Sequence, residues 1–80
     1  MSKLNKAQAS DALIKMANEI ASNIAPGQSQ EHAANLMADH IVRFWAISMK
    51  LQIIKCLEEE NKQLDPTATQ AITLLKEMYS

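Results

Sequence analysis

Apolar side chains recur at helical spacing in four stretches of the chain, which short polar or turn-forming segments separate. This repeat of three and four residues predicts amphipathic helices, because such positions share one helix face. The first helix should begin near Ser10 or Asp11, which can cap free amides, and stop before Ala25-Pro26-Gly27. Its predicted apolar face consists of Leu13, Met16, Ala17, Ile20 and Ile24. Residues 1–9 are expected to form a frayed tail.

The second predicted helix follows Ser29, a good N-cap residue. Its apolar face is expected to contain Ala33, Leu36, Met37, His40, Ile41 and Phe44. Asp39 and Arg43 are four residues apart, so we expect them to pair on the helix surface.

A third stripe follows, with Ile47, Leu51, Ile54 and either Cys56 or Leu57, and with Ile53 beside it. No strong breaker separates it from the second helix, so two alternatives stay open. One is a kink or short turn near Ala46–Ser48, with Ser48 as the cap; the other is a continuous helix from Glu31 to Asn61. In both, the helix ends near Asn61, after the acidic run Glu58–Glu60 that the helix dipole disfavours.

The fourth helix should start at Asp65-Pro66, because aspartate is a good N-cap and proline suits the first helical position. Its predicted apolar face consists of Ala68, Ala71, Ile72, Leu75 and Met78 or Tyr79. With one glycine and two prolines, the chain has the composition of an all-α protein. We therefore predict a small bundle of three to four amphipathic helices, forming a single domain over residues 1–80.

The length and the net charge of the chain limit the classes of function to be considered. A chain of 80 residues buries only roughly 60% of its unfolded surface, so a partner or self-association would help to stabilise it. The net charge of −1 argues against nucleic acid as a partner, since phosphate binding needs concentrated cations. No apolar run reaches the roughly 18 residues of a membrane span. The single cysteine and the lack of a secretory signal favour the cytoplasm.

The residues give no pattern typical of a catalytic, cofactor-binding or metal site. Asp39 and His40 are adjacent, so on a helix they point about 100° apart and cannot form an orienter–base pair. His32 and His40 are eight residues apart, too far to share a metal ion on a straight helix. Cys56 lies on an apolar stripe, which favours a small core residue.

The segment Ala38–Trp45 contains the only Trp, Phe and Arg of the chain and one of its two His residues. Large side chains with polar tips are typical of protein interfaces. We predict a partner-binding surface made of Asp39, His40, Arg43, Phe44, Trp45 and Met49. Phe44 follows the apolar stripe inward, whereas Trp45 lies on the flank, where core and interface roles both stay open. Arg43 and Lys50 are expected on outer faces as a modest basic patch.

Three motifs resemble the small delta subunit of the NAD-dependent, molybdenum-containing formate dehydrogenases. Lys15–Ala21 is similar to the family's "MANQIA" helix. Ala38-Asp39-His40-Ile41 with Arg43-Phe44-Trp45 and then Met49 is similar to its central motif, and Leu64-Asp65-Pro66 followed by Ala71 to its third. Their order and spacing match over about residues 13–75. The family usually has Asp-Pro where this chain has Ala46-Ile47, and its linker glycines are missing here.

The resemblance implies a non-catalytic accessory subunit of a cytoplasmic formate dehydrogenase, without a redox centre of its own. Its partner would be the large subunit, which carries the molybdopterin cofactor and iron–sulfur clusters. The chain would stabilise that subunit or assist insertion of its cofactor.

Two other functions stay open from the residues alone. One is a free-standing homo-oligomeric adaptor of an unrelated pathway, with Trp45 in the self-interface. The other is a small DNA-binding module that uses Arg43, Lys50 and Lys55, which would bind DNA with a steep dependence on salt.

Overall fold

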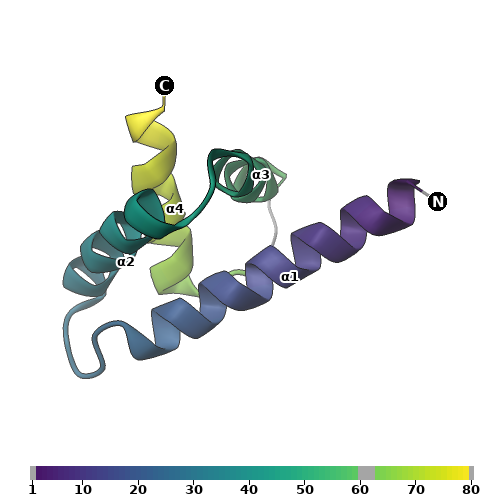
Figure 1. Cartoon of the computed structure of the whole chain (residues 1–80). Coiled ribbons are helices and arrows are strands. Elements are labelled where there is room, and N and C mark those ends of the chain that lie inside the picture. Colours follow the sequence, from purple (N-terminus) through teal and green to yellow (C-terminus); the bar gives the residue numbers. More distant parts are fainter. Residues whose placement is uncertain (1, 60–62, 80) are drawn as a thin grey trace.

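The computed structural model describes the backbone of residues 2–59 and 63–79, and the side chains of residues 11–59 and 63–79. These residues form α1 (Ser2–Asn23), α2 (Gln30–Phe44), α3 (Ile47–Glu58) and α4 (Pro66–Met78), and they contain no strand. The predicted all-α bundle is therefore confirmed for the described part of the chain. Figure 1 shows that α1 runs along the other three helices and extends beyond them at its N-terminal end. None of these helices is long and apolar enough to cross a membrane.

Local capping fixes where two of the helices begin. The Ser29 hydroxyl accepts a hydrogen bond from the backbone amide of His32 at 3.1 Å. The Asp65 carboxylate accepts one from the amide of Thr67 at 3.3 Å, and Pro66 is the first residue of α4. Both predicted caps are confirmed, and Gly27, at φ +80°, makes the predicted turn after α1.

Two predicted helix boundaries differ from the structure. Because α1 begins at Ser2, the predicted start near Ser10 or Asp11 is wrong. Residues 2–9, which we expected to fray, continue the helix, since they are rich in Ala, Lys, Leu and Gln and contain neither Gly nor Pro. The predicted end of the third helix at Asn61 lies outside the described residues; α3 itself ends at Glu58.

All four helices contribute to one cluster of buried side chains. Alanines at 0–1% exposure line α2 and α4, the two helices in most extensive contact, and small side chains let helices approach closely. Most of the predicted apolar faces are buried as expected, including Cys56. The confirmed core positions are Leu13, Ala17, Ala33, Met37, Ile41, Ile54, Cys56, Ala68, Ala71, Ile72 and Leu75.

Several residues that we placed on apolar faces are exposed instead. They are Met16, Leu36, Phe44, Ile47, Leu51, Met78 and Tyr79. In α3 the buried face is rotated away from the predicted one, toward Lys50, Ile53 and Cys56. The helices carry more large apolar side chains than the helices beside them cover. Spacing along one helix does not indicate which of these side chains are exposed.

The junction between α2 and α3 is a real break. Trp45 and Ala46 are both extended, at ψ 143° and 153°, so the continuous helix from Glu31 to Asn61 is wrong and the predicted break is confirmed. The N-cap of α3 is Ala46 rather than the predicted Ser48, and Ala46 has no side chain to accept a hydrogen bond from the first turn. This is the position at which the resemblance leads one to expect aspartate.

We therefore expect Ala46→Asp to stabilise the protein by about 1 kcal/mol, because its carboxylate would accept an amide hydrogen bond at the positive end of α3. For a chain of this length, that raises the melting temperature by about 4–8 °C. Thermal unfolding followed by circular dichroism measures the shift. Ser48→Ala is the matched control, and a change beyond about 0.5 kcal/mol there would mean that Ser48 also caps the helix.

Candidate docking surface

Trp45 is the C-cap residue of α2, and its side chain is buried. Its side chain is only 7% exposed and belongs to the core cluster, and its backbone amide donates to the Ile41 carbonyl at 3.0 Å. The backbone of Trp45 is extended, so α2 ends at Phe44. The indole packs into the core of the bundle. Of the two roles left open for Trp45, the structure places it in the core.

We call the junction between α2 and α3, at Trp45 and Ala46, the corner. Lys50, in the first turn of α3, lies next to it and is almost fully buried, at 8% exposure. Its Nζ donates a hydrogen bond to the Val42 carbonyl at 2.9 Å, in the last turn of α2, where carbonyls lack a helical partner. The same Nζ lies 6.0 Å from the centre of the Tyr79 ring. The expectation that Lys50 forms an outer basic patch with Arg43 is therefore wrong, and the DNA-binding alternative loses one of its three cations.

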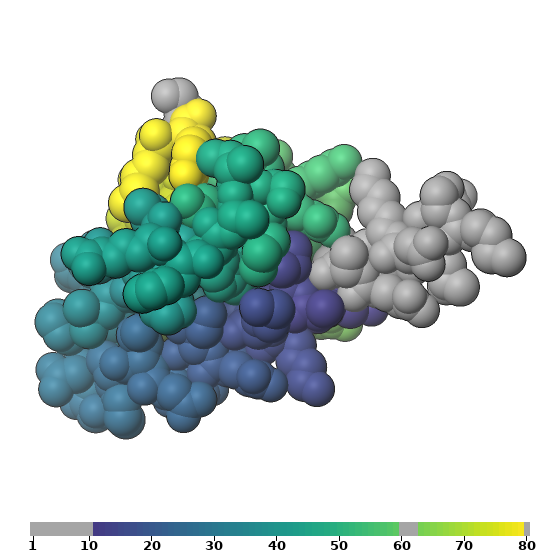
Figure 2. Space-filling view, in the orientation of Figure 1, coloured from purple at the N-terminus to yellow at the C-terminus, as the bar shows by residue number. Residues whose placement is uncertain are grey.

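On the outside of the corner, three large apolar side chains face solvent. Phe44 is 72% exposed, Ile47 58% and Leu51 53%. We call Phe44, Ile47 and Leu51 the corner ridge; Figure 2 shows the corner, in teal, on the face that this view presents. Phe44 was expected inside, and that is wrong. Phe44 is at helical spacing from the buried residues Met37 and Ile41. However, α2 ends at Phe44, and the side chain of Trp45 occupies the core at this point.

The other predicted partner-binding residues divide between surface and core. Asp39 and Arg43 form the predicted surface pair, with Oδ2 and Nε 3.1 Å apart and both side chains mostly exposed. His40 is half-buried, and its ring centre lies 4.8 Å from that of Phe44. Met49 is also half-buried and packs against the core.

Sequence reasoning missed Ile47 and Leu51 as surface residues and Lys50 as a buried one. A signal for Lys50 was present, because it shares a helix face with Ile53, Ile54 and Leu57 at spacings of three, four and seven. No such signal marked Ile47 and Leu51, which are as apolar as the residues that α3 buries.

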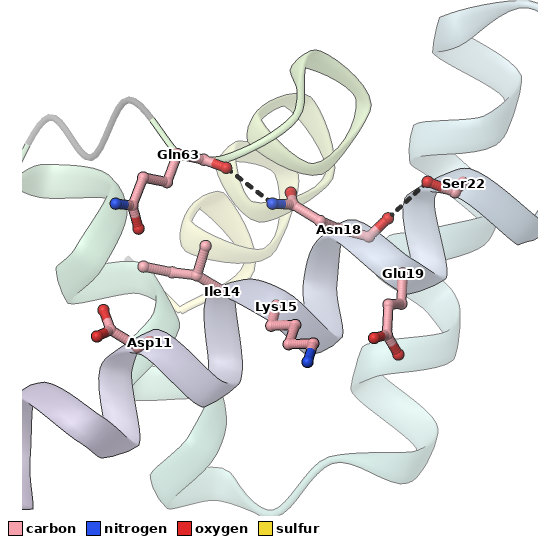
Figure 3. A pocket seen from close by; sticks show the side chains of 7 residues that line it. All are labelled: Asp11, Ile14, Lys15, Asn18, Glu19, Ser22 and Gln63. Carbon is pink, nitrogen blue, oxygen red and sulfur yellow. Dashed lines mark hydrogen bonds between the residues drawn. The ribbon is translucent and has the colours of Figure 1, made fainter.

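A second feature is a shallow, polar hollow along α1, shown in Figure 3, with a volume of about 420 Å³. Asn18 lies at its centre and donates to the Gln63 carbonyl at 2.7 Å. Its other amide atom, Oδ1, accepts from the Asp65 amide at 2.7 Å. Both bonds fasten α1 to the segment before α4, so we interpret Asn18 as a structural residue. Within the described residues, no group of three or more His, Cys, Asp or Glu is placed to hold a metal ion.

Comparison with protein families gives a match over most of the chain. The family model described as NADH-dependent formate dehydrogenase delta subunit (FdsD) matches residues 12–72. The matched range includes all of α2 and α3 and every residue of the predicted partner-binding surface. It confirms the resemblance seen in the three motifs. Comparisons with curated proteins and with solved structures found no match.

The contrast between Phe44 and Trp45 is directly testable. We expect Trp45→Ala to lower the free energy of unfolding by about 3–5 kcal/mol, because it leaves a cavity in the core. Phe44→Ala should change it by less than about 0.5 kcal/mol, as expected for an exposed side chain. Urea unfolding of both variants measures the two values, and equal losses would contradict the exposure of Phe44.

Proposed function

Because the chain belongs to the family of the NADH-dependent formate dehydrogenase delta subunit, we propose that it is a non-catalytic accessory subunit of a cytoplasmic formate dehydrogenase complex. Its partner in this proposal is the large, molybdenum-containing catalytic subunit. The chain stabilises that subunit or assists insertion of its cofactor. The family match over residues 12–72 is the observation that carries the proposal.

The corner ridge supports a binding role. Phe44, Ile47 and Leu51 are each more than half exposed. An exposed cluster of large apolar side chains is unfavourable in water and is typical of surfaces that a partner covers. Aromatic residues are also enriched among the side chains that dominate binding energy. We therefore propose Phe44 as the main contact, with Trp45 and Lys50 holding the corner that presents it.

The remaining predicted contacts surround Phe44. His40 contacts the Phe44 ring, and the Asp39–Arg43 pair lies on the exposed side of the same helix. Exposed ion pairs add little affinity but help to orient a partner. We place these three residues at the rim of the proposed interface, and Met49 beneath it as a supporting residue.

Affinity purification of the tagged chain from its native cells, with mass spectrometry and molybdenum analysis of the eluate, tests the proposal. We expect a formate dehydrogenase large subunit and molybdenum to co-purify. The bare chain, or a pure homo-oligomer, would instead support the free-standing adaptor. Both outcomes are read from one experiment, since the two functions differ in what is bound.

Within the complex, we expect Phe44→Ala to weaken binding of the large subunit by at least about 1 kcal/mol. The free chain should unfold as the unaltered protein does, because Phe44 is exposed. Titration of the purified large subunit, followed by biolayer interferometry, measures the change. Met16→Ala, which truncates an exposed methionine on α1, is the control; equal weakening by both variants would argue against a localised contact.

A further inference from the structure

On the flank of α2 away from the corner ridge, a groove of about 500 Å³ runs between α2 and α4. Its apolar floor is formed by Ala38, Val42, Leu74 and Met78. Two carboxylates, Asp39 and Glu77, line its rim, and among the residues whose side chains the structure describes no lysine or arginine lines it. Such a groove fits an amphipathic helix that presents apolar side chains followed by a cation.

The chain itself carries a helix face of that kind. Ile47 and Leu51 are spaced by four residues on α3, and Lys55 follows after another four, so the three share one face. Ile47 and Leu51 are 58% and 53% exposed, and Lys55 is exposed as well. Glu58, one turn further along, is bound to Lys76 at 3.2 Å.

We propose that the α2–α4 groove binds the exposed face of α3 from a second copy of this chain. Ile47 and Leu51 of one copy lie on Val42, Leu74 and Met78 of the other, and Lys55 lies beside the carboxylates of Asp39 and Glu77. The contact is complementary in both polarity and charge. Both carboxylates already take part in an interaction, Asp39 with Arg43, but each is exposed. Exposed pairs contribute little, so a second cation can lie beside either carboxylate.

This contact is heterologous, because each copy offers one ridge and one groove that are different surfaces. It also uses Ile47 and Leu51, which belong to the proposed docking surface for the catalytic subunit. A chain bound to another copy through α3 therefore cannot dock through the same residues. The proposed self-contact uses one face of a single helix and one groove, so we expect it to be weak and to depend on concentration.

Sedimentation velocity of the purified chain alone, over a range of concentrations, tests this inference independently of the proposed function. We expect the mean sedimentation coefficient of the unaltered protein to rise with concentration. Leu51→Glu removes the ridge, and Val42→Lys places a cation in the groove; each variant alone should remain monomeric. A mixture of the two should form a one-to-one heterodimer, because the first retains its groove and the second its ridge.

The charges can be tested in the same instrument. Lys55→Glu should weaken self-association by at least about tenfold, and adding Glu77→Lys in the same chain should restore most of it. Lys15→Glu, an equal change of charge on α1, should have no such effect. A monomeric unaltered protein, a mixture that does not associate, or equal effects of Lys15→Glu and Lys55→Glu would each overturn the proposal. Thermal unfolding of every variant shows that it is folded.

Discussion

Burial of the Trp45 indole is the constraint on which the arrangement of α2 and α3 depends. An indole cannot reach the core from the flank of a continuing helix, so α2 ends at Phe44 and two extended residues follow. This turn sets the direction of α3 and brings the Lys50 amine to the Val42 carbonyl, 2.9 Å away. It also leaves Phe44, the last residue of α2, 72% exposed. The high exposure of Phe44, the highest among the exposed large apolar residues of the described chain, thus follows from the burial of its neighbour.

The distribution of apolar side chains explains why such a small protein is suited to work as a subunit. Alanines allow α2 and α4 to approach closely, so part of the surface between these two helices is buried by small side chains. Large ones remain outside on α3 and at the C-terminal ends of α2 and α4. The exposure of these side chains favours binding to another protein, because burial of apolar surface drives association.

If α3 serves both the self-contact and the catalytic subunit, then the two forms of association compete. A weak self-contact would cover the apolar ridge while no partner is present and release it when a tighter partner binds. Mass action then decides between them, so the outcome depends on the concentrations and on the difference in affinity. The charge of Lys55 beside Asp39 and Glu77 gives the self-contact its specificity, and Asp39 also belongs to the rim proposed for the catalytic subunit.

The sequence by itself determined the features that arise from local chemistry. Ser29, Asp65-Pro66 and Gly27 acted as predicted, because a cap or a turn involves only residues a few positions apart. The all-α class and most of the core followed from the helical spacing of apolar residues. The family resemblance likewise rested on residues read directly from the chain. Of the candidate site, the Asp39–Arg43 pair was predictable, since both partners lie on one helix.

Only the tertiary structure decided which side of each helix is covered by other helices and at which residue α2 ends. Phe44 is exposed although it was expected inside, and Trp45, for which both roles were open, is buried. Periodicity assigns a helical face and does not indicate whether a neighbouring helix covers it. Lys50 is buried because its amine meets a carbonyl eight residues earlier, across a turn that no strong breaker announces. Ile47 and Leu51 are surface residues because none of the described side chains of the other helices covers that face of α3. Such outcomes depend on the positions of other helices, which spacing along one helix does not contain.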